Sequence, residues 1–431
     1  MRVLATAAAW LAVLAGGAAL AAPPASPATA TLPRIVVTFA NTPHSPPGPA
    51  GATGSHYGGG NGYLVGQGAL RQARRVAAAY SLRPVASWPI QLLSVHCVVF
   101  EITNGRPVAD VLAALSKDSR VTLAQPLQEF HTLSDANAAS DASAAPAPYN
   151  DPLYDLQTNL TSLGIAKAHH RAQGAGVRVA LIDTAVDTGH PDLSGRIVGT
   201  HSFVPAPAAG RDAARHGTAM AGVMAAVANN HIGIVGVAPQ AQIEVFEACW
   251  QLDPAQDAAV CNTFTLARAL AAAIASGAQL VNLSVGGPAD PLLTALVQAG
   301  LKRGSTFVGA AAGADAPFPT AISGVITAAA SGEPLPPGAL AAPAQRVMTL
   351  RPGGDYDFTS GTSVAAAEIT GVIALLMSAS TGHLGSAEAL TLLRATDTSQ
   401  SADAAVDVNA ALARLDATQS RTAVAARGTQ L

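Results

Sequence analysis

The run Val177-Arg178-Val179-Ala180-Leu181-Ile182-Asp183 decides the fold class. It is short, apolar apart from Arg178 and rich in β-branched residues until it ends at an aspartate, which is typical of a buried strand. Similar runs recur at 243–246, 280–285, 306–312 and 325–329. Helical stretches separate or follow them, at 216–228, 264–275, 291–302 and 362–377. Apolar strands that alternate with helices predict an α/β fold, a doubly wound parallel sheet with helices on both faces.

The composition of the 431-residue chain excludes several classes of function. There are 24 Lys and Arg against 27 Asp and Glu, a formal charge of -3, so no basic surplus exists to neutralise phosphates. We therefore expect no nucleic-acid partner. Hydrophobic residues make up 49% of the chain, enough for a sizeable core, and this excludes disorder throughout.

The N-terminus has the pattern of a secretory signal peptide, which we place at residues 1–21. Met1 and Arg2 precede an Ala/Leu/Val run and the small-x-small site Ala19-Leu20-Ala21. An N-terminal membrane anchor is the alternative. No later apolar stretch reaches about 18 residues without Gly, Pro or a charge. We therefore predict an exported protein, secreted or periplasmic, with no membrane span after signal removal.

The predicted export bears on the oxidation state of the cysteines. Cys249 and Cys261 flank a polar loop and are predicted to form a disulfide in an oxidising compartment. Closing such a short loop would stabilise the fold by roughly 3 kcal/mol in the chain-entropy account. Cys97 lies in an apolar run and is predicted to be a free, buried thiol.

A separate first domain is predicted over residues 34–133. Strand signals lie at 35–39, 95–102 and 121–130, and helical stretches at 69–80 and 108–115. This order indicates a small α+β domain of the split βαβ, ferredoxin-like kind. The rest of the chain is divided into a flexible, exposed linker, the main domain and a disordered tail, at 134–150, 151–417 and 418–431.

Three polar residues fall where an open α/β sheet places its sites, beyond the carboxyl ends of its strands. Asp183 ends a strand, His216 opens an Ala-rich helix, and Ser363 stands at the start of the long apolar helix. Each alone has a common structural explanation: a turn former, a loop residue and a helix N-cap. Together they match a catalytic triad, because a serine hydroxyl needs a base that a third group orients. The helix N-terminus would also aim N–H groups at an oxyanion.

Five segments in this order resemble the subtilisin-like serine proteases, or subtilases. They are ALIDTAVDTGHPDL at 180–193, HGTAMAG at 216–222, GIVGVAP at 233–239, VNLSVGG at 281–287 and GTSVAAA at 361–367. The resemblance implies an exported serine endopeptidase, monomeric and made as a zymogen, that acts on polypeptide. Asp183 would orient the imidazole, His216 would act as general base and then acid, and Ser363 would be the nucleophile. The first domain is similar to the propeptide that assists folding and acts as an intramolecular inhibitor.

The resemblance also assigns the substrate-binding segments. Ser284, Val285 and Gly286 would pair with an extended substrate and form one wall of a pocket. Gly313, with the two alanines before it, would form the other wall. Both stretches are small and uncharged, which favours an apolar side chain before the scissile bond.

One departure from the family pattern concerns the mechanism. Most subtilases have an Asn after Ala-Ala-Gly whose amide donates to the oxyanion, and this chain has Ala314 there, followed by Asp315. The alternative hypothesis is therefore a catalytically weak or inactive subtilase-fold protein that binds polypeptide or has a structural role. Three further departures, compatible with changes in packing, are Ala185, Val364 and Ala367.

The sequence predicts no required cofactor. Its histidines lack the H-E-x-x-H or H-x-x-E-H spacing of a catalytic metal site. Some subtilases bind a structural calcium near segments that resemble Asn229–Gly233 and Asp192. A solvated, Asn-rich turn is the alternative for that loop.

Overall fold

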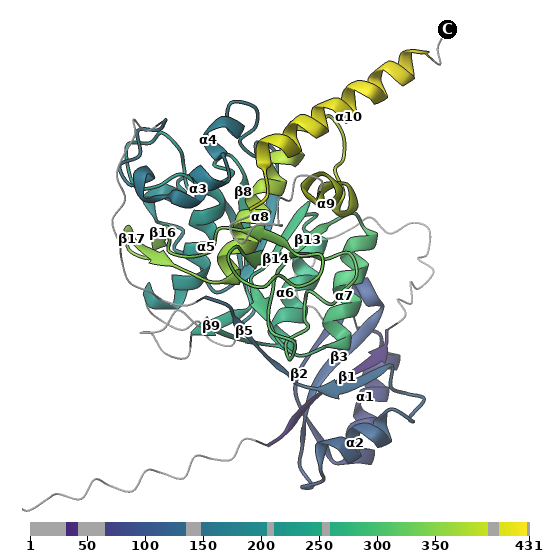
Figure 1. The fold of residues 1–431 in the computed structure, drawn as a ribbon. Coiled ribbons are helices and arrows are strands. Elements are labelled where there is room, and N and C mark those ends of the chain that lie inside the picture. The colour runs from purple at the N-terminus through teal and green to yellow at the C-terminus, as the bar shows by residue number, and fades with distance from the viewer. Residues whose placement is uncertain are drawn as a thin grey trace, which may run out of the picture.

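The computed structural model describes residues 32–41, 65–134, 148–204, 211–251, 259–394 and 405–428. Figure 1 shows a small N-terminal domain beside a larger α/β domain. The predicted signal peptide and residues 135–147 of the predicted linker lie outside the described residues.

A seven-stranded parallel sheet forms the centre of the larger domain, in the order β15-β14-β13-β11-β6-β8-β7. Every neighbouring pair is parallel, so the carboxyl ends of the strands meet at one edge. The strands are β6 (Arg178–Asp183), β7 (Ile197–Ser202), β8 (Gln242–Glu247), β11 (Leu280–Leu283), β13 (Thr306–Ala310), β14 (Ile326–Ala330) and β15 (Leu340–Ala342). The predicted doubly wound fold is confirmed.

Helices cover both faces of this sheet. One face carries α5 (Arg215–Ala225) and α8 (Thr362–Ala379), and the other carries α6 (Thr263–Ala275) and α7 (Pro291–Lys302). Alternate side chains of a strand point to opposite faces, and each joins the core on its own side. Within the described residues α8 is long and apolar enough to cross a membrane, but 83% of it is buried in the protein, as expected of a core helix.

Further elements complete the larger domain. They are α3 (Thr158–Ser162), α4 (Ile165–Ala168), β9 (Cys249–Gln251), β10 (Ala259–Asn262), β12 (Val285–Gly286), β16 (Val347–Arg351), β17 (Asp355–Thr359), α9 (Ser386–Arg394) and α10 (Val408–Gly428). The predicted disulfide between Cys249 and Cys261 is confirmed and joins β9 to β10. The prediction of a disordered tail is wrong for residues 418–428, where the chain continues α10. The Ala, Gln and Arg residues of this segment favour helix.

The N-terminal domain is the predicted small α+β domain. An antiparallel sheet in the order β2-β3-β1-β4 carries α1 (Gln67–Tyr80) and α2 (Val108–Leu115) on one face. Its strands are β1 (Arg34–Ala40), β2 (Leu82–Ile90), β3 (Val95–Ile102) and β4 (Leu123–Pro126). Sequence patterns did not predict β2, because Pro84 and Pro89 interrupt it. The sheet tolerates both because β2 is an edge strand with a register shift after Pro84.

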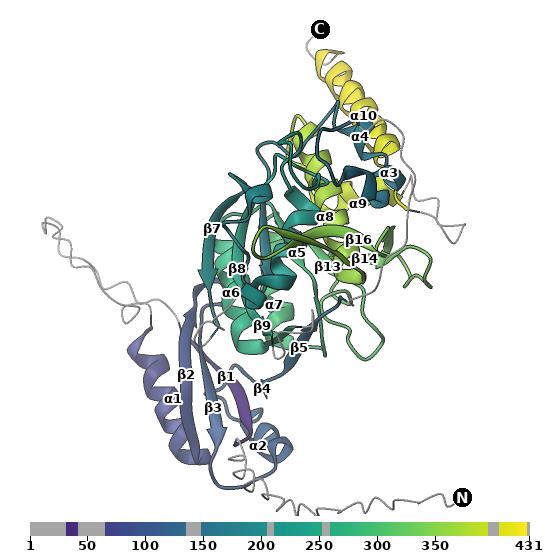
Figure 2. The same ribbon diagram turned by 90° about the vertical axis from the view of Figure 1, so that its left-hand side faces the viewer.

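The other face of this small sheet packs on α6 and α7, and Figures 1 and 2 show the sheet below these two helices. Val36, Cys97 and Val99 share one buried core with the leucines of these two helices. The Gln125 amide donates to Asp290 Oδ2 at 2.8 Å, and Gln125 Oε1 accepts from the Leu292 N–H at 3.1 Å. The first domain therefore lies against the start of α7. Cys97 is free and buried there, as predicted.

The end of the first domain leaves its own sheet. The predicted strand at 121–130 is divided into β4 and β5 (Glu129–Thr132), and β5 joins a second sheet in the order β12-β5-β10-β9. Ser134, predicted to begin an exposed linker, is only 8% exposed because the chain continues from β5 into the larger domain. Tyr149, predicted to lie in the same linker, is also held, since its hydroxyl lies 2.7 Å from Nδ1 of His169.

Candidate active site

Asp183 is placed by the centre of the large sheet. It ends β6, which lies between β11 and β8, so its carboxylate emerges at the carboxyl edge of the sheet. The residue is fully buried. The Thr184 N–H donates to Asp183 Oδ1 at 2.6 Å and fixes the carboxylate.

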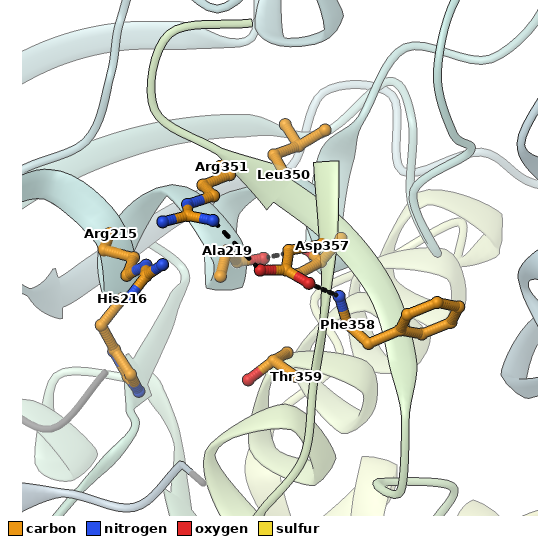
Figure 3. Close-up of a pocket in the computed structure, with 9 residues that line it drawn as sticks. Arg215, His216, Ala219, Leu350, Arg351, Asp357, Phe358 and Thr359 are labelled. Atoms are coloured by element: carbon orange, nitrogen blue, oxygen red, sulfur yellow. Dashed lines mark hydrogen bonds and ion pairs between the residues drawn. The ribbon is translucent and has the colours of Figure 1, made fainter. Parts of the chain in front are cut away.

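His216 lies in the first turn of α5 and is 1% exposed. Its Nδ1 is 2.7 Å from Asp183 Oδ1. Because an ionised carboxylate only accepts hydrogen bonds, neutral His216 carries its proton on Nδ1, and the lone pair of Nε2 can accept a hydrogen bond. Figure 3 shows His216 at one side of a small cavity, with the ion pair of Arg351 and Asp357 at another side.

Ser363 lies in the first turn of α8, after Gly361, whose φ of 122° favours glycine. The Ser363 hydroxyl donates to the Ser284 carbonyl at 3.1 Å and accepts from the Leu133 N–H at 2.9 Å. No hydrogen bond between His216 and Ser363 is present among the described residues. All three predicted triad residues thus meet in one site, with the serine hydroxyl turned to other partners.

The end of the first domain fills this site. The Ser363 N–H donates to the Leu133 carbonyl at 3.1 Å, as an oxyanion-hole donor would. The hydroxyl of the next residue, Ser134, lies 3.1 Å from His216 Nε2. A β-carbon at Gly361 would collide with the Leu133 carbonyl oxygen, so the glycine permits this close approach. The peptide bond between Leu133 and Ser134 therefore spans the serine and the histidine.

The chain before this bond is held as a β-strand. In β5, Thr132 pairs with Val285 and His131 pairs with Gly286 of β12. On the opposite side β5 pairs with β10, and the Ala259 N–H donates to Thr132 Oγ1 at 2.8 Å. β12 thus contacts an extended segment of the same chain, and substrate binding by Val285 and Gly286 stays a prediction.

Two apolar side chains of the bound segment enter the larger domain. A β-carbon at Gly286 would meet both the Leu133 side chain and the β-carbon of Ala312, so these groups lie against one another. The fully buried ring of Phe130 packs edge-to-face on Phe318, 5.3 Å between centroids. Gly287 leaves room for that ring, since a β-carbon there would overlap it.

Gly313, predicted to form part of a pocket wall, is exposed and has open space around its α-carbon. Its role in substrate binding stays a prediction. Ala314 and Asp315 follow in an exposed turn that the Ala316 N–H closes on the Gly313 carbonyl at 2.9 Å. Among the described contacts the Leu133 carbonyl has one donor, the Ser363 N–H, and no side-chain amide.

Comparison with known proteins identifies the family. The family model described as "Subtilase family" matches residues 174–410, more than half of the chain. The chain belongs to the subtilase family. Members are serine peptidases, and this assignment favours a peptidase over the alternative of an inactive binding protein.

The relatives of this subtilase are proteases. Thermitase from Thermoactinomyces vulgaris is 32% identical over 243 residues, which cover 53% of this chain and 85% of thermitase. Subtilisin E from Bacillus subtilis is 30% identical over 226 residues, 48% of this chain and 56% of that protein. The structure of fervidolysin from Fervidobacterium pennivorans, described as a keratinolytic enzyme related to subtilisin, superposes with a TM-score of 0.68 at 20% identity. It covers 89% of this chain and 61% of fervidolysin, and it supports the fold.

The loop that the resemblance suggested as a calcium site does not fit a metal ion in this subtilase. The two oxygens of Asp192 accept from the Asn230 side-chain amide at 2.7 Å and the Ile234 N–H at 2.9 Å. Both oxygens of Asp151 likewise accept backbone N–H groups of this loop. Within the described ranges no three His, Cys, Asp or Glu side chains form a group that could hold a metal. Burial also raises the pKa of Asp192, which disfavours its charged form.

Sequence patterns missed the residues that occupy the cleft. Phe130, Leu133 and Ser134 lie at the end of the first domain, where the strand signal gives way to an unpatterned stretch. That boundary could have pointed to these residues. The pairing of β5 with β12 and β10 could not be predicted from it, because the paired segments lie far apart in sequence.

Proposed function

We propose that this subtilase is a serine endopeptidase made as a zymogen, with Asp183, His216 and Ser363 as its catalytic triad. Ser363 Oγ attacks the carbonyl carbon of a bound peptide while His216 Nε2 takes its proton. The Ser363 N–H stabilises the developing oxyanion, and Asp183 stabilises the imidazolium. His216 then protonates the leaving amine, and water hydrolyses the acyl-enzyme.

The observation that carries this proposal is the position of Leu133. Its carbonyl oxygen accepts from the Ser363 N–H, its side chain lies against Gly286, and its preceding residues form a strand on β12. These are the contacts that a substrate needs before acylation. We therefore propose that the enzyme cleaves its own chain between Leu133 and Ser134.

Mass spectrometry of the exported protein tests this cleavage. We expect wild type to yield a mature chain that begins at Ser134, and Ser363→Ala to remain uncleaved. The same N-terminus in both proteins would show that another protease makes the cut. An N-terminus further along the predicted linker would place the scissile bond elsewhere.

The bound segment also supports a substrate class. Leu133 and Phe130 occupy apolar surroundings, so we propose that substrates carry apolar side chains directly before the scissile bond and three residues earlier. Peptides with Leu or Asp before the bond test the first position. A charged carboxylate in an apolar pocket should lower kcat/KM by about 10²-fold or more. Equal hydrolysis of the two peptides would contradict it.

We further propose that the first domain is the intramolecular inhibitor and that the monomeric enzyme is exported. Inhibition is supported by β5, which fills the cleft that a substrate would use. Export is supported by the N-terminal pattern and by the disulfide between Cys249 and Cys261, a bond typical of oxidising compartments. Cell fractionation with and without residues 1–21 tests export, since loss of the segment should retain the protein in the cytoplasm.

A further inference from the structure

The site holds its base and its nucleophile apart. His216 Nε2 faces the Ser134 hydroxyl at 3.1 Å, while the Ser363 hydroxyl donates to the Ser284 carbonyl at 3.1 Å. In the neutral tautomer of His216 that donates from Nδ1 to Asp183, Nε2 accepts, and the Ser134 hydroxyl is then the donor. The one lone pair that should take the proton of Ser363 is therefore engaged by the residue that follows the scissile bond.

Building on the proposed function, we infer that the Ser134 hydroxyl restrains the first turnover by competing with Ser363 for Nε2 of His216. A single lone pair accepts one strong hydrogen bond, so activation of Ser363 requires the hydroxyl of Ser134 to withdraw. Ser134 is buried at 8% exposure, which shields this contact from competing water. The Leu133 N–H and the Ser284 carbonyl meanwhile hold the Ser363 hydroxyl away from the base.

The restraint is confined to chains with a hydroxyl at this position. Cleavage turns Ser134 into a new N-terminus, and its hydroxyl leaves the site with the departing amine. A substrate with Ala after the scissile bond has no group that reaches Nε2 in this way. The enzyme should therefore discriminate against Ser and Thr directly after the scissile bond, including in its own chain.

Two matched pairs of variants test the inference in the full-length protein. In the first pair, native Ser134 is compared with Ser134→Ala, which lacks the hydroxyl. In the second pair, Ser134→Thr is compared with Ser134→Val, whose side chain has nearly the same shape but no hydroxyl. One neutral hydrogen bond changes a rate by about 2- to 10-fold. The protein with Ala at position 134 should therefore be cleaved faster than the one with Ser, and the protein with Val faster than the one with Thr, by that factor. If Thr at position 134 keeps the slow rate of native Ser and Val does not, the effect is due to the hydroxyl and not to a change in packing.

The measurement is the first-order rate of cleavage after Leu133 during refolding, followed by mass spectrometry, with Ser363→Ala as the blank. Equal rates within both pairs, or slower cleavage of Ala and Val, would overturn the inference while leaving self-cleavage intact. Absence of Ser363-dependent cleavage in every variant would overturn the proposed function and the inference together. If the variants do not fold, peptides that span residues 129–138 with Ser, Ala, Thr or Val at 134 and the mature enzyme give the same comparison through kcat.

Discussion

At the residue scale, the oxyanion site depends on very few donors. The Ser363 N–H contacts the Leu133 carbonyl, and the sequence resemblance predicts that Ala314 takes the place where most subtilases carry an amide. The exposed turn at Ala314 leaves room for a longer side chain, because Gly313 beside it has open space around its α-carbon.

Ala314→Asn should therefore raise kcat and leave KM little changed, because the added amide would act mainly on the transition state. One such donor is worth about 10²–10³ in kcat, a magnitude measured on subtilisin itself. Steady-state hydrolysis of a peptide that ends in Leu before the bond checks the prediction, with Ala316→Asn in the same turn as the control. An unchanged kcat would mean that another group, such as the Thr362 hydroxyl, already fills this place.

A second residue-scale feature is a buried pair of side chains, one of which lies on α8. Asn159 Nδ2 donates to Glu368 Oε1 at 2.8 Å, while Asn159 Oδ1 and Glu368 Oε2 are both buried without a partner among the described contacts. A proton on Oε2 would complete a second hydrogen bond between the same two side chains. Burial raises the pKa of Glu368 well above its ordinary value, in agreement with a neutral acid.

The stabilisation from this pair should fall as pH rises. It is complete below the ordinary carboxyl pKa of 4.5 and is lost as pH approaches the raised pKa of the folded state. The slope is at most about 1.4 kcal/mol per pH unit. Glu368→Gln keeps both hydrogen bonds without the titration, so its free energy of unfolding should lose this slope. Urea unfolding in the Ser363→Ala background at several pH values checks it, and identical pH profiles for both proteins would contradict it.

At the element scale, β5 binds the cleft through one deeply buried side chain. Phe130 has no exposed surface and contacts Phe318 and Gly287, whereas its neighbour Glu129 is exposed. The strand itself adds main-chain pairing on both edges, to β12 and β10. The ring should therefore contribute much of the energy that holds the first domain in place.

Phe130→Ala in the uncleavable Ser363→Ala protein should destabilise docking of the first domain by about 3–5 kcal/mol, the usual range for a buried Phe. Glu129→Ala is the control and should stay within about 0.5 kcal/mol of the parent. Urea unfolding followed by Trp88, which lies in the first domain, measures the difference. Equal shifts for the two variants would show that the main-chain pairing alone holds the strand.

At the scale of the whole molecule, the first domain covers the helices α6 and α7, and the end of its chain covers Ser363 and His216. Cys97 lies in the buried contact between its sheet and these helices, and burial raises the pKa of its thiol. A thiol in that setting is shielded from reagents and present mainly in its unreactive form.

Cys97 should consequently report on release of the first domain. In native Ser363→Ala protein we expect no reaction with a thiol reagent, and in wild type a reactive thiol that appears after cleavage and dissociation. Thiol titration alongside gel analysis measures both events, and urea-unfolded Ser363→Ala gives the value for one free thiol. Immediate reaction of native Ser363→Ala would show that the two domains do not pack as described.

Local signals were sufficient for much of this protein. The apolar strand that ends at Asp183 and the apolar helix that begins near Ser363 predicted the α/β fold, because strand and helix periodicity depends on neighbouring residues. Asp183, His216 and Ser363, singled out from the sequence, lie together in the structure. The disulfide followed from the spacing of Cys249 and Cys261 in a chain predicted to be exported. The edge strand β2 was missed, since its prolines oppose strand formation unless one edge stays unpaired.

Tertiary structure alone decided what occupies the cleft and how its groups are paired. The contacts of Leu133 and Ser134 with Ser363 and His216 span between 82 and 230 positions of the chain. No local pattern encodes such a contact, because it depends on where the docked first domain directs β5. The same holds for Glu368 and Asn159, which lie 209 positions apart. The sequence by itself determined which residues can do the chemistry, and packing of two domains determined which of their hydrogen bonds are made.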